Sequence, residues 1–374
     1  MKVYIEKIDN YDLEKISSFL KNSFDNSDLW QKLEGKNNIL IKPNLLGAYH
    51  PDKAVTTNPI VLEALIQILQ EKGKNVTLGD SPGGAVSVKK VWQDTGILAL
   101  TEKYKIPLVH FSEGGVVTHK TENHEFSTTK YYWDADAVFD VAKYKTHSLM
   151  YYTGAVKNLY GLIPGLKKSD YHAKNSDHIQ FSTVVSELYN LVKGKLCFSI
   201  VDGIWGMEGE GPSAGDPRNF GLMFASESAS ALDAVASRML GFKLDQLVYL
   251  KQALDYDKIS LSDIEVEDEW KSFQFDKVKI KRVSALIKVL AYSPEFLKKW
   301  FQKLFQYYPD FNEKCKKCNI CVKSCPVDAM TLTGDMEHPE IDYNKCIKCM
   351  CCHEMCPYHA VYIRKSKLAK YVLK

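Results

Sequence analysis

The chain has 374 residues, of which 45% are apolar and 25% are charged, and its net charge at pH 7 is +3. This length allows two or three domains with sizeable cores, and so small a charge gives no indication of nucleic-acid binding. No run of about 18 apolar residues predicts a transmembrane segment, and the first residues, MKVYIEKIDNYDLEKISSFL, lack a secretory core, so we expect a cytoplasmic protein.

Strand-like and helix-like segments alternate along residues 1–282. Strand patterns occur in KVYIEKI, NNILIKPNLL, NVTLGD, DAVFDVAKYKTH, CFSIVDGIWG and NFGLMFASES. Between the second and third of these, NPIVLEALIQILQEKG has apolar residues at helical spacing, with Pro59 near its start and Gly73 at its end. The alternation predicts an α/β domain with a largely parallel sheet and flanking helices.

Polar loops follow four of these predicted strands: IKPNLLG, GDSPGG, KYKTHSLMYYTGAVKNLYGLIPG and VDGIWGMEGEGPSAG. Ligands of parallel sheets bind beyond the carboxyl ends of the strands, so we expect the loops to converge on one anion-binding cleft. Ammonium, imidazole and carboxylate groups together suit an anionic ligand and proton transfer. The predicted catalytic residues are Lys42, His147 and Lys157, and the predicted cofactor-binding residues are Asp80, Ser81, Lys145, Asn158 and Asp202.

Several polar features of this region have two interpretations. GDSPGG either binds a phosphate or carboxylate or is only a tight turn, because it lacks the order of a nucleotide-binding loop. Glu208 and Glu210 are either an acid and a base or solvated charges of a loop. His172 lies in a polar stretch that could form a lid, and Asp233 falls in the first turns of a predicted helix. No H-x-H or H-E-x-x-H pattern predicts a separate catalytic metal site.

Two amphipathic helices, divided at Pro294, are predicted for the linker at residues 283–309. The second is aromatic and basic, and could lie on a membrane surface. We favour instead that it docks one domain onto another.

Nine of the ten cysteines lie in the last sixty residues, in two copies of the pattern C-x-x-C-x-x-C-x-x-x-C-P. In such repeats three cysteines of one copy and the fourth of the other bind the same iron–sulfur cluster. Structural zinc is the weaker alternative, because zinc commonly uses separated C-x-x-C pairs. The predicted ligands of two 4Fe-4S clusters are Cys315, Cys318, Cys321 and Cys356 for one, and Cys346, Cys349, Cys352 and Cys325 for the other.

Residues 310–374, with CPVDAM, CPYHAV and IDYNKC, resemble a bacterial two-cluster ferredoxin followed by a basic tail. The resemblance implies a small α+β domain. That family often has Gly where this chain has Asn319 and Met350, and Met tolerates a left-handed backbone poorly. We therefore expect a slightly altered second loop. Cys351 is interpreted as an additional thiol that binds neither cluster.

Lysines surround the first cysteine loop: Lys314, Lys316, Lys317 and Lys323. Positive charge there would raise the reduction potential of a cluster and offer a binding surface to an acidic electron carrier, such as a ferredoxin or flavodoxin. The alternative is a solvated loop without a partner.

The stretches KPN, GDSPGG, KTH…GAVKNLYG and VDGIWGMEGEGP resemble domain of unknown function family 362, whose members often carry a C-terminal ferredoxin module. This resemblance implies an α/β fold and a link to redox or metal chemistry, without a settled reaction. TGAVKNLYGLIPG also resembles a glycine-rich, lysine-containing loop of nickel-pincer lactate racemases, which is a hint about fold only.

The sequence thus predicts an iron–sulfur redox protein, interpreted as an oxidoreductase whose clusters relay electrons to a substrate or cofactor in the anion-binding cleft. A non-enzymatic electron-transfer partner and a metal-centre assembly protein remain as alternatives. No sure flavin motif is present, so an additional organic cofactor stays open.

Overall fold

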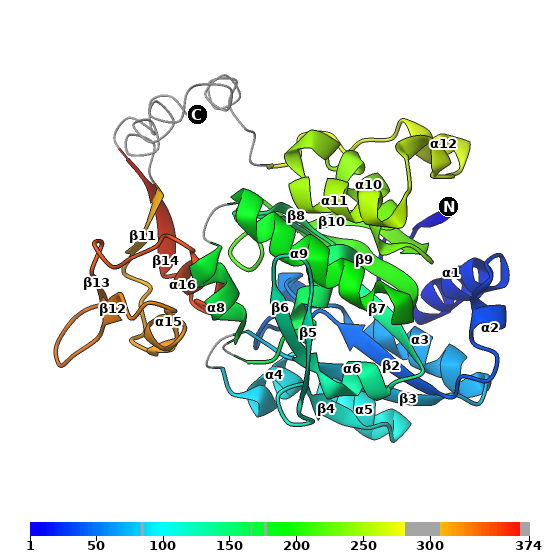
Figure 1. Ribbon diagram of the computed structural model, residues 1–374, viewed down its shortest axis with the longest axis horizontal. Coiled ribbons are helices and arrows are strands. Elements are labelled where there is room, and N and C mark those ends of the chain that lie inside the picture. Colours follow the sequence, from blue (N-terminus) through cyan, green and yellow to red (C-terminus); the bar gives the residue numbers. More distant parts are fainter. Residues whose placement is uncertain (84–85, 166, 176–177, 281–306, 367–374) are drawn as a thin grey trace.

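The largest part of the molecule is a layered α/β domain built around one sheet of eight strands (Figure 1). This computed structural model describes residues 1–83, 86–165, 167–175, 178–280 and 307–366. The spatial order of the strands determines which loops meet. In that order they are β1 (Val3–Lys7), β10 (Asp216–Ser226), β9 (Leu196–Glu208), β7 (Ala137–His147), β2 (Asn38–Pro43), β3 (Asn75–Asp80) and β4 (Leu108–His110), and β8 (Tyr151–Thr153) pairs with the end of β7.

The centre of this sheet is parallel. β2 pairs in parallel with β3 and β7, while β3 pairs with β4 and β7 with β9. Beyond β9 the sheet continues antiparallel through β10 and β1. The expected largely parallel α/β fold is therefore confirmed. The antiparallel strands at one side were not predicted, because an apolar segment does not reveal the direction in which its strand runs.

Helices cover both faces of the sheet. α1 (Leu13–Asp25) and α3 (Pro59–Glu71) pack on one face, and α9 (His178–Val192), α10 (Ala229–Met239) and α11 (Val248–Asp257) pack on the other. Successive side chains of β7 enter the two cores alternately, so every residue of this strand is buried. Burial on both faces of the sheet explains why the sequence of β7 is long and rich in apolar residues.

The predicted helix after the second strand forms as α3. The side chain of Asn58 accepts a hydrogen bond from the backbone N of Ile60 at 3.0 Å, and Pro59 occupies the first turn, where its missing N–H is not needed. The remaining helices of this domain are α2 (Leu29–Lys32), α4 (Val88–Asp94), α5 (Ile97–Tyr104), α6 (Lys130–Asp134), α7 (Ala155–Asn158), α8 (Lys167–Lys174) and α12 (Asp268–Lys271), and a hairpin is formed by β5 (Val116–Lys120) and β6 (Glu125–Thr129).

The cysteine-rich module has the small α+β fold that its resemblance to ferredoxins implies. Two short helices, α15 (Ile320–Lys323) and α16 (Cys351–Glu354), follow the two cysteine loops. Two small antiparallel sheets complete it: β11 (Tyr307–Phe311) with β14 (Val361–Lys365), and β12 (Met330–Thr331) with β13 (Glu340–Ile341).

The two halves of this module repeat one another closely. Asn319 and Met350 precede α15 and α16 in nearly the same left-handed conformation, with φ and ψ of 63° and 7° against 62° and 12°. Backbone N atoms of Ala329 and Ala360 donate to the sulfurs of Cys325 and Cys356, each at 3.3 Å. The expected distortion of the second loop at Met350 is therefore not seen. The methionine is held in this strained region while its buried side chain packs inside the module.

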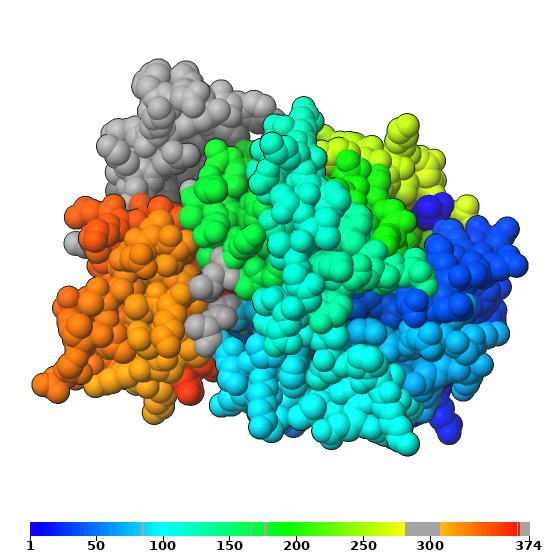
Figure 2. Space-filling view, turned by 60° about the horizontal axis from the view of Figure 1, so that its bottom comes forward, coloured from blue at the N-terminus to red at the C-terminus, as the bar shows by residue number. Residues whose placement is uncertain are grey.

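The module sits at one side of the α/β domain, as the orange surface in Figure 2 shows. The amphipathic helices expected for residues 283–309 lie outside the described residues, apart from β11 at their end, and so does the basic tail after residue 366. None of the helices in the described part of the chain has the length and apolar composition needed to cross a membrane.

Candidate functional site

The carboxyl ends of β2 and β3 bring together a buried ion pair. Lys42 Nζ lies 2.9 Å from Asp80 Oδ1, and both side chains are almost completely buried. Asp80 also accepts hydrogen bonds from the backbone N atoms of Leu45 and Ser81, each at 2.8 Å. A Cβ at Gly161 would lie 2.6 Å from Lys42 Nζ, so only glycine allows the backbone to cover the pair this closely. The pair is thus sealed beneath the segment that follows α7.

A chain of amide groups connects this ion pair to Lys145 on β7. Lys42 Nζ lies 3.4 Å from Asn158 Oδ1, which also accepts a hydrogen bond of 3.0 Å from Asn44 Nδ2. Asn44 Oδ1 in turn accepts from Lys145 Nζ at 2.8 Å. The structure therefore joins Lys42, Asp80, Lys145 and Asn158 in one buried network, which we call the lysine network.

Among the described residues, no carboxylate lies in hydrogen-bonding contact with Lys145. Its second hydrogen bond, of 2.8 Å, goes to the backbone O of Val55. Burial lowers the pKa of Lys145 well below its ordinary value, and the neighbouring ammonium groups of Lys157 and Lys143 lower it further. Asp140, on the other side of Asn158, accepts a hydrogen bond of 2.7 Å from that side chain. Burial raises the pKa of Asp140 well above the usual carboxyl range.

Asp202 belongs to a different cluster. Its carboxylate lies 2.8 Å from Lys143 Nζ, and both side chains are fully buried. Tyr11 donates to the same carboxylate at 3.0 Å, and the backbone N of Asn58 donates at 3.0 Å. These contacts hold β9 against β7, against the start of α3 and against the residues just before α1. The structure thus places Asp202 at the predicted edge but pairs it with Lys143 rather than with the lysine network.

Ser81 connects the GDSPGG loop to the segment after α7. Its hydroxyl accepts a hydrogen bond of 3.1 Å from the backbone N of Gly165, and its carbonyl accepts one from Lys168 Nζ. Burial lowers the pKa of Lys168 to about 8, against the opposing effect of Asp80. Sequence reasoning missed Lys168, because it lies in an ordinary charged stretch, LKKSD, where nothing distinguishes it from Lys167.

Lys157 lies on α7, and a buried carboxylate positions this short helix. Asp233 accepts hydrogen bonds from the backbone N atoms of Ala155 and Val156 at 2.8 and 2.9 Å, and from the hydroxyl of Tyr152 at 3.1 Å. Burial raises the pKa of Asp233 to about 7, and these hydrogen bonds oppose the rise. Sequence reasoning placed Asp233 in the first turns of a helix, α10, but did not predict that it holds α7.

Of the lysine side chains at these strand ends, Lys157 makes the fewest polar contacts. In the described part of the chain it has no hydrogen-bond or ion-pair partner, and its Nζ lies 5.9 Å from the centre of the Tyr160 ring. Burial lowers the pKa of Lys157, and Glu354 and Cys351 of the ferredoxin-like module act against this shift. Charges on α16 therefore act on Lys157.

His147 faces the same helix of the module. Its Nδ1 accepts hydrogen bonds from the backbone N atoms of Leu149 and Met150 at 3.0 and 3.2 Å. The proton of the neutral ring therefore lies on Nε2. Burial lowers the pKa of His147 well below its usual value, with Lys157 as the next cause. The Nε2 atom lies 3.5 Å from Oε1 of Glu354, and neither atom has a hydrogen-bond partner among the described residues.

Two loops of the α/β domain contact the end of α16. Ser213, in the GEGPSAG loop, donates a hydrogen bond of 2.8 Å to the backbone O of Glu354. A Cβ at Gly83, in the GDSPGG loop, would lie 2.8 Å from Met355 Sδ, so the loop and the module are in close contact. Burial raises the pKa of Tyr49 to about 12, a hydrogen bond with Ser213 opposes this shift, and the charge of a Cys356 thiolate contributes to it. Sequence reasoning missed Glu354, since nothing in the sequence distinguishes it from the other charged residues of the cysteine loops.

Three further predicted candidates are engaged by contacts within the α/β domain. Glu208 accepts a hydrogen bond of 2.9 Å from Arg218 and one of 3.1 Å from the backbone N of Lys279. Glu210 accepts from Ser148 at 3.2 Å. His172 is buried in α8 and stacks on Phe181 with 3.9 Å between ring centres, and burial lowers its pKa to about 3. These contacts indicate structural roles for Glu208 and His172.

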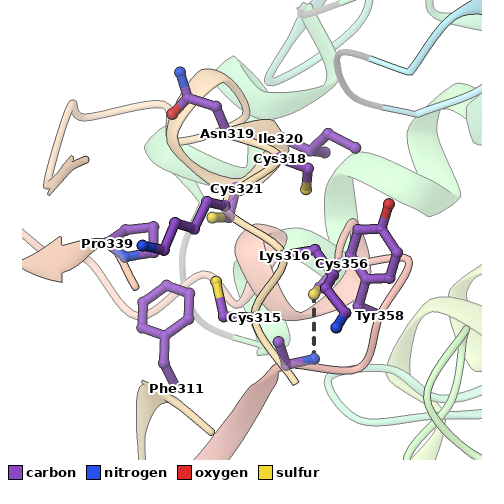
Figure 3. A pocket seen from close by; sticks show the side chains of 12 residues that line it. Phe311, Cys315, Lys316, Cys318, Asn319, Ile320, Cys321, Pro339, Cys356 and Tyr358 are labelled. Carbon is purple, nitrogen blue, oxygen red and sulfur yellow. Dashed lines mark hydrogen bonds between the residues drawn. The ribbon is translucent and has the colours of Figure 1, made fainter. Parts of the chain in front are cut away.

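The first cysteine quartet surrounds one open hollow of the module (Figure 3). Cys315, Cys318 and Cys321 line it from the first repeat, and Cys356 lines it from the second. Lys316, Lys317 and Tyr358 also line this hollow, and Cys318 and both lysines are exposed. This hollow therefore opens to solvent beneath a basic rim.

The second quartet surrounds another open hollow. Cys346, Cys349 and Cys352 line it together with Cys325 of the first repeat. Cys351 lines it as well, and its thiol pKa is raised by a hydrogen bond with Cys349 and by burial. No three His, Cys, Asp or Glu side chains of the described ranges are placed to hold a single metal ion. Each quartet instead places four cysteine side chains around one hollow, and thiolates are the ligands that bind iron–sulfur clusters.

Comparison with known proteins agrees with this division of the chain. A family model described as domain of unknown function (DUF362) matches residues 39–238, which is more than half of the 374 residues. The chain belongs to this family. A second model, for a 4Fe-4S dicluster domain, matches residues 314–360. This member of the DUF362 family is therefore an iron–sulfur protein with a redox role.

Two individual proteins are similar to this DUF362 protein. The thylakoid-associated protein sll1697 of Synechocystis is 36% identical over 203 residues, which are 54% of this chain and 62% of that protein. The chain thus spans less than two thirds of that relative. The lactate racemase apoprotein of Thermoanaerobacterium thermosaccharolyticum gives a TM-score of 0.39 and 16% identity over 60% of this chain and 54% of that one. A similarity of that size supports no inference about mechanism.

Proposed function

We propose that this protein is an oxidoreductase in which the ferredoxin-like module passes electrons to a small anionic ligand at the strand ends of the α/β domain. The observation that carries the proposal is the contact of α16 with this edge. Glu354 lies 3.5 Å from His147 and is held through its backbone by Ser213. This short helix thus carries one predicted cluster ligand, Cys352, and through Glu354 it reaches the buried strand-end residue His147.

Two 4Fe-4S clusters are proposed as the resident cofactors, held by the quartets that line the two hollows. Such clusters supply one-electron transfer at potentials that depend on their surroundings. Each quartet has two buried cysteines, but Cys318 of the first quartet is exposed, whereas the second quartet has no exposed cysteine. This difference supports an order in which electrons enter at the first hollow and leave through the second.

The ligand is proposed to be a small anion because several lysines at these strand ends have no carboxylate in hydrogen-bonding contact among the described residues. Lys42 is balanced by Asp80, but Lys145 and Lys168 donate hydrogen bonds to neutral oxygens. Lys157 has the freest ammonium group, and His147 presents an N–H. Buried cations of this kind are costly unless a counter-charge is present.

The proposed roles follow from these positions. Lys157 and His147 contact the ligand, and Lys42 with Asp80 and Asn158 holds the network beneath them. Ser81 and Lys145 position the loops around it, and Asp202 orders the neighbouring strand ends through Lys143. Neither an organic cofactor nor the substrate itself is specified by these contacts.

The proposed electron-transfer partner is an acidic one-electron carrier such as a ferredoxin or flavodoxin. The exposed side chains of Lys314, Lys316, Lys317 and Lys323 surround the first cysteine loop and would attract it. We propose a cytoplasmic location for the protein. Because the Synechocystis relative carries the name thylakoid-associated protein, fractionation of cells into membrane and soluble parts is the direct test of that location.

One observation favours the alternative of a non-enzymatic electron-transfer or metal-centre assembly protein. Lys42 and Asp80 are sealed beneath Gly161, so part of the network has a structural role. The experiment that distinguishes the two proposed functions is to purify the protein without oxygen and to determine its bound small molecules by mass spectrometry. An enzyme is expected to retain or saturably bind a small anion. A stable complex with an acidic carrier or larger enzyme, without any such ligand, would support the alternative.

A further inference from the structure

The two cysteine repeats have the same backbone at equivalent positions. The residues that precede α15 and α16 have nearly equal φ and ψ. Two further equivalent pairs are also left-handed, with φ of 52° at Lys317 and 60° at Lys348, and of 47° at Asp328 and 51° at His359. Each repeat also donates one backbone hydrogen bond of 3.3 Å to the sulfur of its fourth cysteine. Differences between the two cysteine sites must therefore come from side chains and from exposure to solvent.

The charged side chains of the two repeats differ. Lys316 is exposed and lines the first hollow, whereas the equivalent residue Ile347 lines the second (Figure 3). Two lysines line the first hollow, and no charged side chain of the described residues lines the second. Lys323 ends α15, whereas its equivalent Glu354 ends α16. The first repeat is thus more positive than the second.

The residues after the fourth cysteines add to this difference. Cys325 belongs to the first repeat but lines the second hollow, and Asp328 follows it by three positions. Cys356 lines the first hollow, and the residue at the equivalent position after it is His359. Because the fourth cysteines cross over, the segment that carries the aspartate belongs to the second hollow.

Charge and exposure act on the reduction potential in the same direction. Reduction adds negative charge to a cluster, so nearby lysines and water stabilise the reduced state, and nearby carboxylates destabilise it. Cys318 of the first quartet is exposed, whereas its equivalent Cys349 is buried. Both effects favour reduction of a cluster in the first hollow over reduction of one in the second.

We propose that the cluster of the first hollow has the higher reduction potential and is filled before the cluster of the second. Each reduction adds one electron from an external one-electron donor, and no bond of the protein is made or broken. In protein that holds one electron, we expect the first cluster to be reduced at least tenfold more often than the second, which corresponds to about 59 mV. The second cluster is then the stronger reductant, and it is reduced only in a module that holds two electrons. This inference rests on the two clusters of the proposed function.

The repeat itself provides the variants that test this order. Lys316→Ile gives the first loop the side chain of the second, and Ile347→Lys makes the opposite change. Neither side chain is foreign to this backbone, because each already occupies the equivalent position in the other repeat. Lys251→Ile, which removes an exposed charge from α11, is the matched control. Iron and sulfide analysis verifies that each variant of the full chain is assembled without oxygen.

The two midpoint potentials are measured at low salt by voltammetry and by a titration followed with electron paramagnetic resonance. The wild type is expected to show two separate one-electron steps. Lys316→Ile should lower the higher potential, and Ile347→Lys should raise the lower one, so both variants bring the steps closer together. Each should change the ratio of the two reduced populations by on the order of threefold. Lys251→Ile should leave the separation unchanged.

The direction of these changes decides the order of the clusters, and either variant alone is sufficient. Repulsion between two equal clusters would also separate the steps, but Lys316→Ile and Ile347→Lys would then widen the separation, and that result overturns the inference. A single unresolved step in the wild type, or an unchanged separation in both variants, overturns it as well. In all these cases about eight iron per chain leaves the two-cluster proposal standing. About four iron per chain in the wild type overturns both.

Discussion

His147 Nε2 and Glu354 Oε1 lie 3.5 Å apart, although 207 residues of chain separate them. One belongs to the central strand β7 and the other to the helix that follows the second cysteine loop. Neither atom has a hydrogen-bond partner in the described ranges, although buried polar atoms are usually satisfied. The boundary between the α/β domain and the module thus contains two buried polar atoms whose hydrogen-bonding capacity is not satisfied among the described residues.

The assignment of cysteines to hollows predicts which replacement damages which cluster. Cys356→Ser is expected to impair the cluster bound by Cys315, Cys318 and Cys321, because its sulfur lines their hollow. Cys351→Ser should leave both clusters in place. The wild type should contain about eight iron and eight sulfide ions per chain. Iron and sulfide analysis, with electron paramagnetic resonance of the reduced proteins, checks both statements. Loss of only the other cluster in Cys356→Ser would show that the pairing is wrong.

The free energy of unfolding is expected to depend on pH because of Asp233. Its folded-state pKa of about 7 lies above the ordinary value of 3.8, so the folded protein holds a proton that the unfolded chain has lost. The free energy of unfolding should therefore fall as pH rises from about 4 to about 7, by up to about 1.4 kcal/mol per pH unit, and change no further above that. Thermal unfolding of wild type and Asp233→Asn at pH 5 and pH 8 measures the difference. Asp255→Asn, an exposed change on α11, is the control.

In that experiment the wild type should lose more thermal stability between the two pH values than Asp233→Asn does. Equal losses in the two proteins would show that Asp233 does not titrate as described. The comparison between variants removes contributions from other groups, because these remain the same in both proteins.

Part of this arrangement could be predicted from the sequence. The alternating elements and the loops after β2, β3 and β7 were predictable, because apolar periodicity and turn residues are local features. Both cysteine quartets also followed from spacing. Glu354 and Lys168 were not predictable, because each acquires its surroundings only when distant segments meet. The ion pair of Asp202 with Lys143 was likewise not predictable, because it depends on the register between β7 and β9.

Lys168 predicts a pH limit on anion binding. Its pKa of about 8 means that it loses its charge as pH rises through that value. The charged groups that act on it are Asp80, Lys42 and Lys157. Anion affinity should therefore fall above pH 8, by up to about tenfold per pH unit if binding requires the charged form. Phosphate binding to wild type, Lys168→Met and Lys167→Met between pH 7 and pH 9.5 measures this.

Lys168→Met should bind phosphate weakly at all these pH values and lose most of the dependence. Lys167→Met changes the neighbouring exposed lysine and should follow the wild type. The interpretation is contradicted if both variants follow the same profile.

The basic rim of the first hollow predicts salt-dependent electron transfer. Lys316 and Lys317 are exposed and line that hollow beside Cys318. Replacing both by Glu should slow reduction by an acidic ferredoxin at least tenfold at low salt, and the difference should shrink as salt increases. Stopped-flow absorption at several salt concentrations measures the rates. Lys345→Glu, an exposed change in the same module, is the control. Equal rates in all three proteins would show that the carrier does not use this rim.

The central claim is that the module delivers electrons from its second cluster to a ligand at the strand ends. Crystals grown without oxygen and measured at the iron absorption edge test it most directly, because the anomalous density locates the iron atoms independently of the protein. The account predicts two iron clusters, with the inner one bound by Cys325, Cys346, Cys349 and Cys352 on the side facing Lys157, and density for a small anion between Lys157 and His147. An inner cluster turned away from Lys157, with protein atoms filling the space beside His147, would contradict it.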